Sequence, residues 1–288
     1  MTSDSLTLSD STLRRPPSGL AAALPLTEIN ALIATAHALA DAARVATLDY
    51  FRRPGLAADN KETVRFDPVT MGDRLSEQRM REILAERRPQ DAILGEEFGT
   101  STGTSGLTWV LDPIDGTRGF LTGSPTWGVL ISLRDETGPV YGIIDQPHIG
   151  ERFEGGFGLS RVAGPRGTHP LATRPERGLE EAFLYSTFPE IGSEAEYAAF
   201  RRVSQKAKLV RYGMDCYAYA LLAAGQIDLV IEAGLQAYDI QAPMAVIRAA
   251  GGVVTSWDGG DCAQGGRVLA AANPGIHAAA LELLNATA

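Results

Sequence analysis

The chain of 288 residues has few of the side chains on which several common kinds of active site depend. It has two cysteines, Cys216 and Cys262, without a CxxC spacing or a nearby histidine, which argues against a zinc site and a disulfide framework. Its four histidines are scattered, so zinc is disfavoured and no Ser-His-Asp or Cys-His arrangement is evident. We therefore expect two reduced thiols and a chemistry that relies on other groups.

Positive charge and long apolar runs are scarce too. The chain has 26 Lys and Arg against 35 Asp and Glu, and its net charge of −9 argues against nucleic acid or an anionic membrane as the main partner. No apolar run approaches the roughly 18 residues of a membrane span. The opening MTSDSLTLSDST lacks the regions of a secretory signal, so the expected location is the cytoplasm. An anionic substrate would need local positive charge, from metal ions or helix N-termini.

Apolar spacing predicts alternating helices and strands. Residues 1–26, rich in Ser, Thr and Pro, are expected to form a flexible tail that ends at Thr27, the N-cap of the first helix. An N-terminal α+β lobe over 27–160 and a C-terminal α/β lobe over 161–288 are expected, joined through the Gly/Pro/Arg-rich segment 161–178. Helices are expected at 28–51, 73–88, 215–226, 238–250 and 274–284. Strands are expected at 92–97, 107–112, 127–134, 140–145, 227–232, 252–257 and 267–272, with a hairpin at 151–158.

The stretch WVLDPIDGTRGF (109–120) places Asp112 and Asp115 three positions apart at the end of an apolar strand. Both side chains point in similar directions only if the chain turns sharply, which Pro113 and Gly116 favour. A solvated surface turn is a common fate of such a motif. The motif by itself therefore leaves two interpretations open, a surface turn and a binding site.

Further acids lie at the ends of other predicted elements. These are Glu96 and Glu97 in ILGEEFG, Asp67 and Asp73 in DPVTMGD, and Asp239 at a helix start. Four acidic clusters are harder to explain as solvated turns, whereas Mg²⁺ binds through a few carboxylates together with substrate phosphates. Metal ions would then supply the positive charge that the chain lacks. The backbone amides of Gly116 and Thr117 would offer a cradle for the phosphate.

Three motifs resemble, in order and spacing, the signatures of the inositol-monophosphatase-like superfamily of Mg²⁺-dependent, lithium-sensitive phosphatases. They are GEE (95–97), WVLDPIDGT (109–117) and YDIQAPMAVIRAAGGVV (238–254). The resemblance covers the chain from about residue 27. It implies an α+β fold, an alternating α/β/α/β/α layered sandwich of the inositol monophosphatase/fructose-1,6-bisphosphatase type. It also implies two or three Mg²⁺ ions, a small phosphorylated metabolite as substrate, and a homodimer.

The resemblance implies roles for individual residues. The implied metal ligands are Glu96, Asp112, the Ile114 carbonyl, Asp115, Asp239 and, for a third and loosely held ion, Asp73. Glu96 and Thr117, with Asp112 in the catalytic set, would activate the attacking water, while the amides of Gly116 and Thr117 hold the phosphate. Lys61 and Glu97 are weaker candidates. The implied reaction is direct attack of a metal-activated water on phosphorus, without a covalent phospho-enzyme.

Within the superfamily, three stretches look most like the histidinol-phosphate phosphatase branch. They are IDQPHIGERFEGG (144–156), YGMDCYAYALLAAGQIDLVIEAGLQAYD (212–239) and GGVVTSWDG (251–259). Histidinol phosphate carries an amine and an imidazole that can be cationic, which acids beyond the metal ligands would suit. The resemblance implies that Asp215 and Glu232, together with Asp239, contact the substrate. A helix cap at Asp215 and a turn acid at Glu232 are the alternatives. Gln236 stands where several inositol-type enzymes have a histidine, which weakens the inositol interpretation.

Two alternative functions stay open. One is an inositol-1-monophosphatase or a broader sugar-phosphate phosphatase of the same fold. The other is a non-catalytic RNA-processing or regulatory binding module, against which the intact set of acids argues. Trp127 and Trp257 are expected in the core. Arg152 either enters the active site from a neighbouring loop or is a solvated hairpin arginine.

Overall fold

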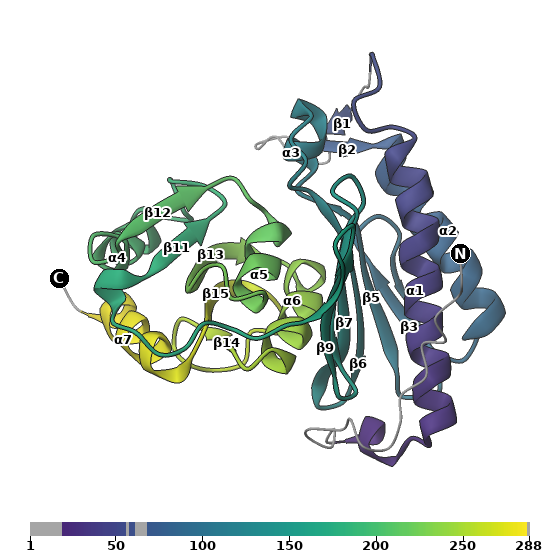
Figure 1. Ribbon diagram of the computed structural model, residues 1–288. Coiled ribbons are helices and arrows are strands. Elements are labelled where there is room, and N and C mark those ends of the chain that lie inside the picture. Colours follow the sequence, from purple (N-terminus) through teal and green to yellow (C-terminus); the bar gives the residue numbers. More distant parts are fainter. Residues whose placement is uncertain (1–18, 56–57, 61–67, 287–288) are drawn as a thin grey trace.

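The computed structural model describes residues 19–55, 58–60 and 68–286, which are arranged in alternating layers (Figure 1). Helices α1 and α2 cover one face of an eight-stranded sheet. Helices α5 and α6 lie between this sheet and a five-stranded one, whose far face carries α4 and α7. The α+β class and the α/β/α/β/α layering predicted from the sequence are confirmed.

The helices have the following bounds: α1 (Leu26–Leu48), α2 (Met71–Arg87), α3 (Thr117–Thr122), α4 (Glu194–Ser204), α5 (Cys216–Ala223), α6 (Ala237–Ala249) and α7 (Pro274–Asn285). The first sheet, in spatial order, consists of β10 (Gly167–Pro170), β9 (Leu159–Gly164), β8 (Glu151–Gly156), β7 (Gly138–Gln146), β6 (Gly128–Asp135), β5 (Thr108–Asp115), β3 (Ala92–Gly95) and β4 (Gly99–Ser101). The second consists of β12 (Leu209–Tyr212), β11 (Phe183–Ser186), β13 (Leu229–Leu235), β15 (Gly266–Ala271) and β14 (Val253–Ser256). A small ribbon pairs β1 (Ala58–Asn60) with β2 (Pro68–Thr70).

The start of the described chain departs from the prediction. Residues 20–23 form a 3-10 turn (η2, Leu20–Ala23) whose Ala21 is buried and donates its N–H to Asp135, so this part of the predicted tail is anchored. Helix α1 begins at Leu26 with Pro25 in the N-cap position, and the predicted cap Thr27 was wrong because it lies in the first turn.

Helix α1 is a core helix of the first layer. Its length and composition alone would allow it to cross a membrane, but half of that apolar window is buried inside the protein. Leu32, Ala36 and Leu39 on its apolar face belong to the same buried cluster as Trp109 and Ile131 of the sheet.

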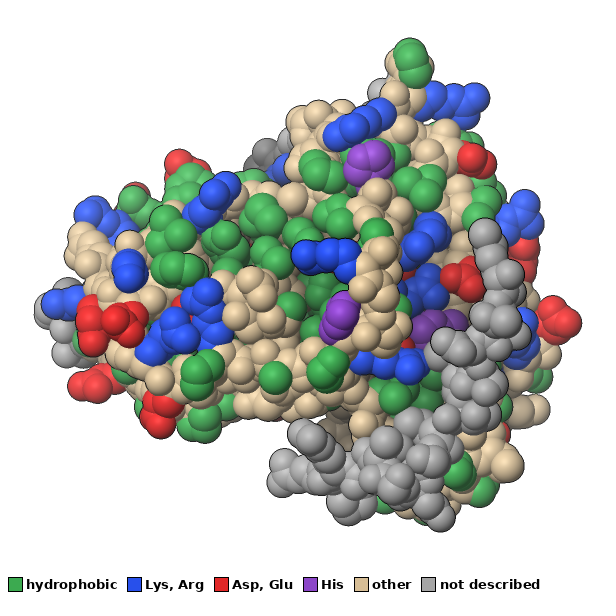
Figure 2. Space-filling model, viewed as in Figure 1, with side chains coloured by type: hydrophobic (Ala, Val, Ile, Leu, Met, Phe, Trp, Pro, Cys, Tyr) green, Lys and Arg blue, Asp and Glu red, His purple; other side chains and the backbone are tan. Residues whose placement is uncertain are grey.

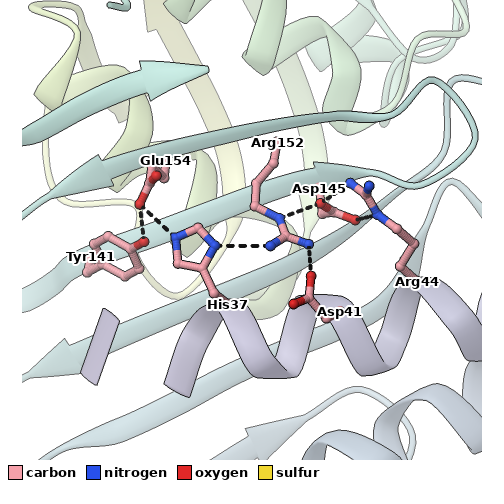
Figure 3. A network of polar contacts seen from close by, with 7 residues as sticks. All are labelled: His37, Asp41, Arg44, Tyr141, Asp145, Arg152 and Glu154. Carbon is pink, nitrogen blue, oxygen red and sulfur yellow. Dashed lines mark hydrogen bonds and ion pairs between the residues drawn. The ribbon is translucent and has the colours of Figure 1, made fainter. Parts of the chain in front are cut away.

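Polar side chains of α1 form a network with side chains of β7 and β8 in the first sheet (Figure 3). Arg152 donates to Asp145 at 2.7 Å, to Asp41 at 2.8 Å and contacts His37 Nδ1 at 3.0 Å. Arg44 also donates to Asp145, which is fully buried. Both interpretations of Arg152 drawn from the sequence were therefore wrong, because it joins α1 to β7 and β8 instead of reaching the acidic motifs or solvent.

The middle layer depends on glycines that let α6 approach the first sheet closely. A Cβ at Gly142 would lie 2.5 Å from the carbonyl oxygen of Ala242, and one at Gly155 would lie 2.6 Å from Val246 Cα. The predicted hairpin is formed by β8 and β9, but it turns at Phe157 and Gly158, while Gly155 lies inside β8 against the helix. Trp127 and Trp257 are buried and both cysteines are free, as expected.

The predicted division into lobes at residue 160 stays a prediction, yet the first sheet runs past it through β9 and β10 to Pro170. Between 179 and 212 the structure also has β11, α4 and β12, for which the sequence analysis expected no element. Helix α6 keeps Pro243 in its second turn.

Charge is distributed unevenly between interior and surface. Nine acidic side chains in the described ranges are buried, whereas none of the Lys and Arg side chains in those ranges is. On the face in Figure 2, hydrophobic side chains interspersed with Lys and Arg occupy the middle, while Asp and Glu stand mainly toward the ends of the view.

We predict that Gly142→Ala destabilises the protein by about 1–3 kcal/mol, because the added methyl meets rigid helix backbone. Urea unfolding measures the change. Gly164→Ala is the matched control, since its Cβ would meet mainly the flexible side chain of Glu151. Equal stability of the two variants would contradict the close approach of α6.

Candidate active site

A β-bulge brings Asp112 and Asp115 to the same face of the first sheet. Asp112 pairs with Leu130 and Asp115 with Gly128, so Pro113 and Ile114 together face one residue of β6. Side chains alternate along a strand, and residues three apart would normally point to opposite faces; one extra residue cancels that difference. The prediction of a sharp turn between the aspartates was therefore wrong. Strand β5 continues through Asp115, and a bulge brings the two side chains to one face.

The parallel pairing of β3 with β5 places Glu96 beside Asp112. Gly95 pairs with Leu111, and the N–H of Glu96 donates to the Leu111 carbonyl at 3.1 Å. The carboxyl ends of parallel strands meet at one edge of a sheet, and the two carboxyl groups come within hydrogen-bonding reach there.

Asp239 reaches the same place from the second half of the chain. It lies in the first turn of α6, and its Oδ2 accepts the N–H of Gln236 at 2.7 Å. Oxygen atoms of Asp112, Asp115 and Asp239 all lie within 4.8 Å of one another. We call these three residues the acidic cluster.

Asp73 lies in the first turn of α2, close to the acids that follow β3. Its Oδ2 accepts the N–H and the hydroxyl of Thr70, which makes it part of a capping box. Its other oxygen, Oδ1, is buried and has no hydrogen-bond partner. The pKa of Asp73 is raised to about 7, mainly by burial and also by the charges of Glu96 and Glu97, against the opposing hydrogen bonds of Thr70.

Burial and mutual repulsion dominate the electrostatics of the acidic cluster. Burial, then the charges of Glu96, Asp115 and Asp239, raise the pKa of Asp112 well above its ordinary value. The pKa of Asp115 is raised in the same way, by burial and then by Asp215 and Asp239. An all-oxygen donor set, three crowded carboxylates that are buried or partly buried, and the unpartnered Asp73 Oδ1 fit hard divalent cations.

The remaining residues of the predicted set lie immediately after the bulge. Thr117 donates its hydroxyl to the carbonyl of Ile114 at 3.2 Å. Gly116 adopts a left-handed conformation, with φ of 87°, where a Cβ would lie 2.8 Å from the carboxylate of Asp215. A side chain at position 116 would therefore clash with Asp215, which comes from a distant part of the sequence.

Asp215 does not cap α5. It precedes that helix, but its side chain makes no capping hydrogen bond and its backbone has a strained φ of 47°. The predicted alternative of a helix cap was wrong. Burial raises the pKa of Asp215 to about 6, although the charge of Arg118 and a hydrogen bond with Thr126 act in the opposite direction.

Glu232 is buried at the end of the regular part of β13. Its Oε1 accepts both the N–H of Thr187 at 2.9 Å and the Thr187 hydroxyl at 2.8 Å. Burial raises its pKa to about 8, and the charges of Asp215 and Asp239 contribute against the two hydrogen bonds. A solvated turn acid, the alternative weighed for this position, does not agree with a side chain that is 5% exposed.

Sequence reasoning missed the residues that hold the turn after Glu96. Glu77 is fully buried on α2 and accepts the N–H of Glu97 at 2.7 Å and that of Phe98 at 3.2 Å. Arg81, one turn along, pairs with Glu77 at 2.7 Å. An acid and an arginine four apart on a helix ordinarily indicate a surface pair, so the sequence carries no signal for this contact. The candidates Lys61 and Asp67 lie outside the described residues.

A sequence profile described as the inositol monophosphatase family matches residues 28–288. The chain is 40% identical over 269 residues to the bifunctional phosphatase IMPL2, chloroplastic, of Arabidopsis thaliana, covering 90% of this chain and 76% of that protein. It is 34% identical to a histidinol-phosphatase of Streptomyces coelicolor, over 87% of this chain and 95% of the relative. Among solved structures, an inositol monophosphatase from Zymomonas mobilis is 37% identical, with a TM-score of 0.77 over 88% of this chain and 97% of that one.

We predict that Glu232→Gln flattens the pH dependence of stability of the metal-free protein. The folded-state pKa of Glu232 lies near 8, above that of an unfolded glutamate, so its contribution is complete below about pH 4.3 and is lost as the pH rises through 8. The variant should therefore lose less unfolding free energy between pH 5 and 8.5, by on the order of 1–3 kcal/mol.

Urea unfolding in EDTA at several pH values measures this difference. The exposed Glu82→Gln is the control, because Glu82 lies on α2 and is half exposed. Parallel pH profiles for wild type and Glu232→Gln would contradict the predicted titration.

Proposed function

The chain belongs to the inositol monophosphatase family, and from this premise we propose that it hydrolyses L-histidinol phosphate to L-histidinol and phosphate. The coarser function follows from the family and the acidic cluster, which make the chain a metal-dependent phosphomonoesterase acting on a phosphorylated small molecule. The substrate is the proposal. The observation that carries it is a pair of acids, the partly buried Asp215 and the buried Glu232, next to the acidic cluster.

The metals proposed here are Mg²⁺ ions. Glu96, Asp112, Asp115, Asp239 and the Ile114 carbonyl would hold two of them, and Asp73 would reach a third. When bound, such ions lower the pKa of a water and stabilise developing negative charge on the leaving oxygen. Glu96 and Thr117 would orient the attacking water, and the contacts of Glu96 with Asp112 and of Thr117 with the Ile114 carbonyl support this role.

Asp215 and Glu232 are suited to a cationic leaving group. Glu232 is buried and Asp215 is partly buried, and burial raises their pKa values to about 8 and about 6, so a cationic partner would stabilise both negative charges. An ammonium or imidazolium group placed between them would supply that compensation, and a hydrogen bond to a charged partner is worth about 1.5–3 kcal/mol. The amine and imidazole of histidinol phosphate meet this requirement, whereas the hydroxyls of an inositol do not.

One observation supports the alternative substrate, an inositol phosphate. The Zymomonas mobilis structure is that of an inositol monophosphatase, and its 37% identity is no lower than that of the histidinol-phosphatase of Streptomyces coelicolor. Against this, Asp215 has a strained backbone, and its negative charge acts on Asp115 of the cluster. Both features cost free energy, and a neutral polyol would not offset this cost as a cationic leaving group would. The cytoplasmic location, the homodimer and the absence of a nucleic-acid partner stay predictions.

We predict that wild type hydrolyses histidinol phosphate with a higher kcat/KM than inositol 1-phosphate. Asp215→Asn should lower kcat/KM for histidinol phosphate by about 10–100-fold, since a charge-assisted contact is lost, and affect inositol 1-phosphate much less. Phosphate release measures both. Faster turnover of inositol 1-phosphate by the wild type would contradict the proposed substrate but not the assignment as a phosphatase.

We predict further that Asp112→Asn loses activity toward every phosphomonoester by at least about a hundredfold, because a ligand of the cluster becomes neutral. Calorimetric titration with MgCl₂ should show binding to wild type that is weaker or absent in this variant. Wild type that binds no Mg²⁺ would instead favour the non-catalytic RNA-processing or regulatory role.

A further inference from the structure

Phe188 is an exposed aromatic residue at the edge of the proposed leaving-group site. It lies two residues after β11 and is 44% exposed, one of four exposed aromatic residues in the described part of the chain. An isolated exposed ring is common on protein surfaces and needs no explanation by itself. Its neighbours, however, are the residues proposed to bind the substrate.

The backbone on both sides of Phe188 is held in place. Thr187 is bound through its N–H and its hydroxyl to Glu232, at 2.9 and 2.8 Å. Pro189 follows, and a residue before proline is restricted to extended conformations. The carbonyl oxygens of Ser186 and Thr187 accept the N–H of Gly213, two residues before Asp215. The loop that presents Phe188 is thus bound to Glu232 and to the backbone two residues before Asp215.

Arg118 connects the ring to the opposite half of the protein. Its guanidinium carbon lies 4.9 Å from the centroid of the Phe188 ring. Arg118 belongs to α3, directly after the Gly116–Thr117 turn, and its charge also acts on Asp215. Phe188 is therefore linked to both proposed substrate acids, through Thr187 to Glu232 and through Arg118 to Asp215.

We propose that Phe188 is a specificity-determining residue whose ring stacks on the imidazole of the leaving group, with Arg118 bordering the same site. This inference rests on the proposed function and adds the group that recognises the ring, since Asp215 and Glu232 recognise charge. Stacking between two aromatic rings in offset geometry stabilises a complex beyond the burial of area. An aliphatic side chain at this position would supply the burial without the stacking.

The experiment compares two substrates that differ only in the ring. Histidinol phosphate and alaninol phosphate carry the same phosphate and the same amine, but alaninol phosphate has a hydrogen in place of the imidazole. The measured quantity is the ratio of kcat/KM for histidinol phosphate to that for alaninol phosphate. A purely structural role of Phe188 would change both values together and leave the ratio unchanged.

Phe188→Ala should lower this ratio about three- to tenfold through a higher KM for histidinol phosphate, and Phe188→Trp should restore it. Tyr197→Ala is the matched control, because Tyr197 is also a 40% exposed ring, with Arg201 5.9 Å from its centroid, but lies on α4. An unchanged ratio in Phe188→Ala, or an equal fall in Tyr197→Ala, overturns the inference.

The outcome for the wild type separates this inference from the proposed function. Wild type that does not hydrolyse histidinol phosphate refutes both. Wild type that prefers histidinol phosphate to inositol 1-phosphate, together with a ratio that Phe188→Ala leaves unchanged, refutes only the stacking role.

Discussion

The repulsion among buried carboxylates is the constraint around which this protein is arranged. Four acids of the site each accept a backbone N–H, and the four donors lie in different parts of the fold. Ile114 donates to Asp112, Cys216 to Asp115, Gln236 to Asp239 and Thr70 to Asp73. Three of these donors lie at helix N-termini, whose partial positive charge favours an anion. The helices α2, α5 and α6 therefore fix the acids in position and reduce their mutual repulsion before any cation is bound.

This arrangement explains why the two halves of the chain form one site. The N–H of Cys216 in the second half holds Asp115 of the first, and Asp239 at the start of α6 completes the acidic cluster. Helix α6 can deliver Asp239 only because Gly142 and Gly155 let it lie directly on β7 and β8. The geometry of the site thus depends on packing in the middle layer, because a shift of α6 would move the carboxylate of Asp239.

Much of the fold was predictable because its signals are local. The apolar spacing of α1 and the strand-like runs around Trp109 needed no tertiary information, and the motif DPIDGT identified the acids of β5. The bulge was not predictable, because Asp112 and Asp115 reach one face through their pairing with β6 and not through a turn of their own. Glu77, Phe188 and the contact of Asp215 with Gly116 depend on residues distant in sequence, so no window of the sequence contains them. Arg152 was misjudged for the same reason, because its hairpin position suggested the active site or solvent, whereas its partners His37 and Asp41 lie on α1, far away in the sequence.

The burial of acidic side chains determines where the net charge of −9 can be compensated. Nine acids of the described residues are buried, whereas no Lys or Arg of those residues is. Burial does not remove their charge, so an approaching phosphate ester still meets the field of a negatively charged molecule, and cations that bind among the interior acids would compensate part of it. Diffusion of an anion toward this protein should accordingly depend less on ionic strength when cations are bound than when they are absent.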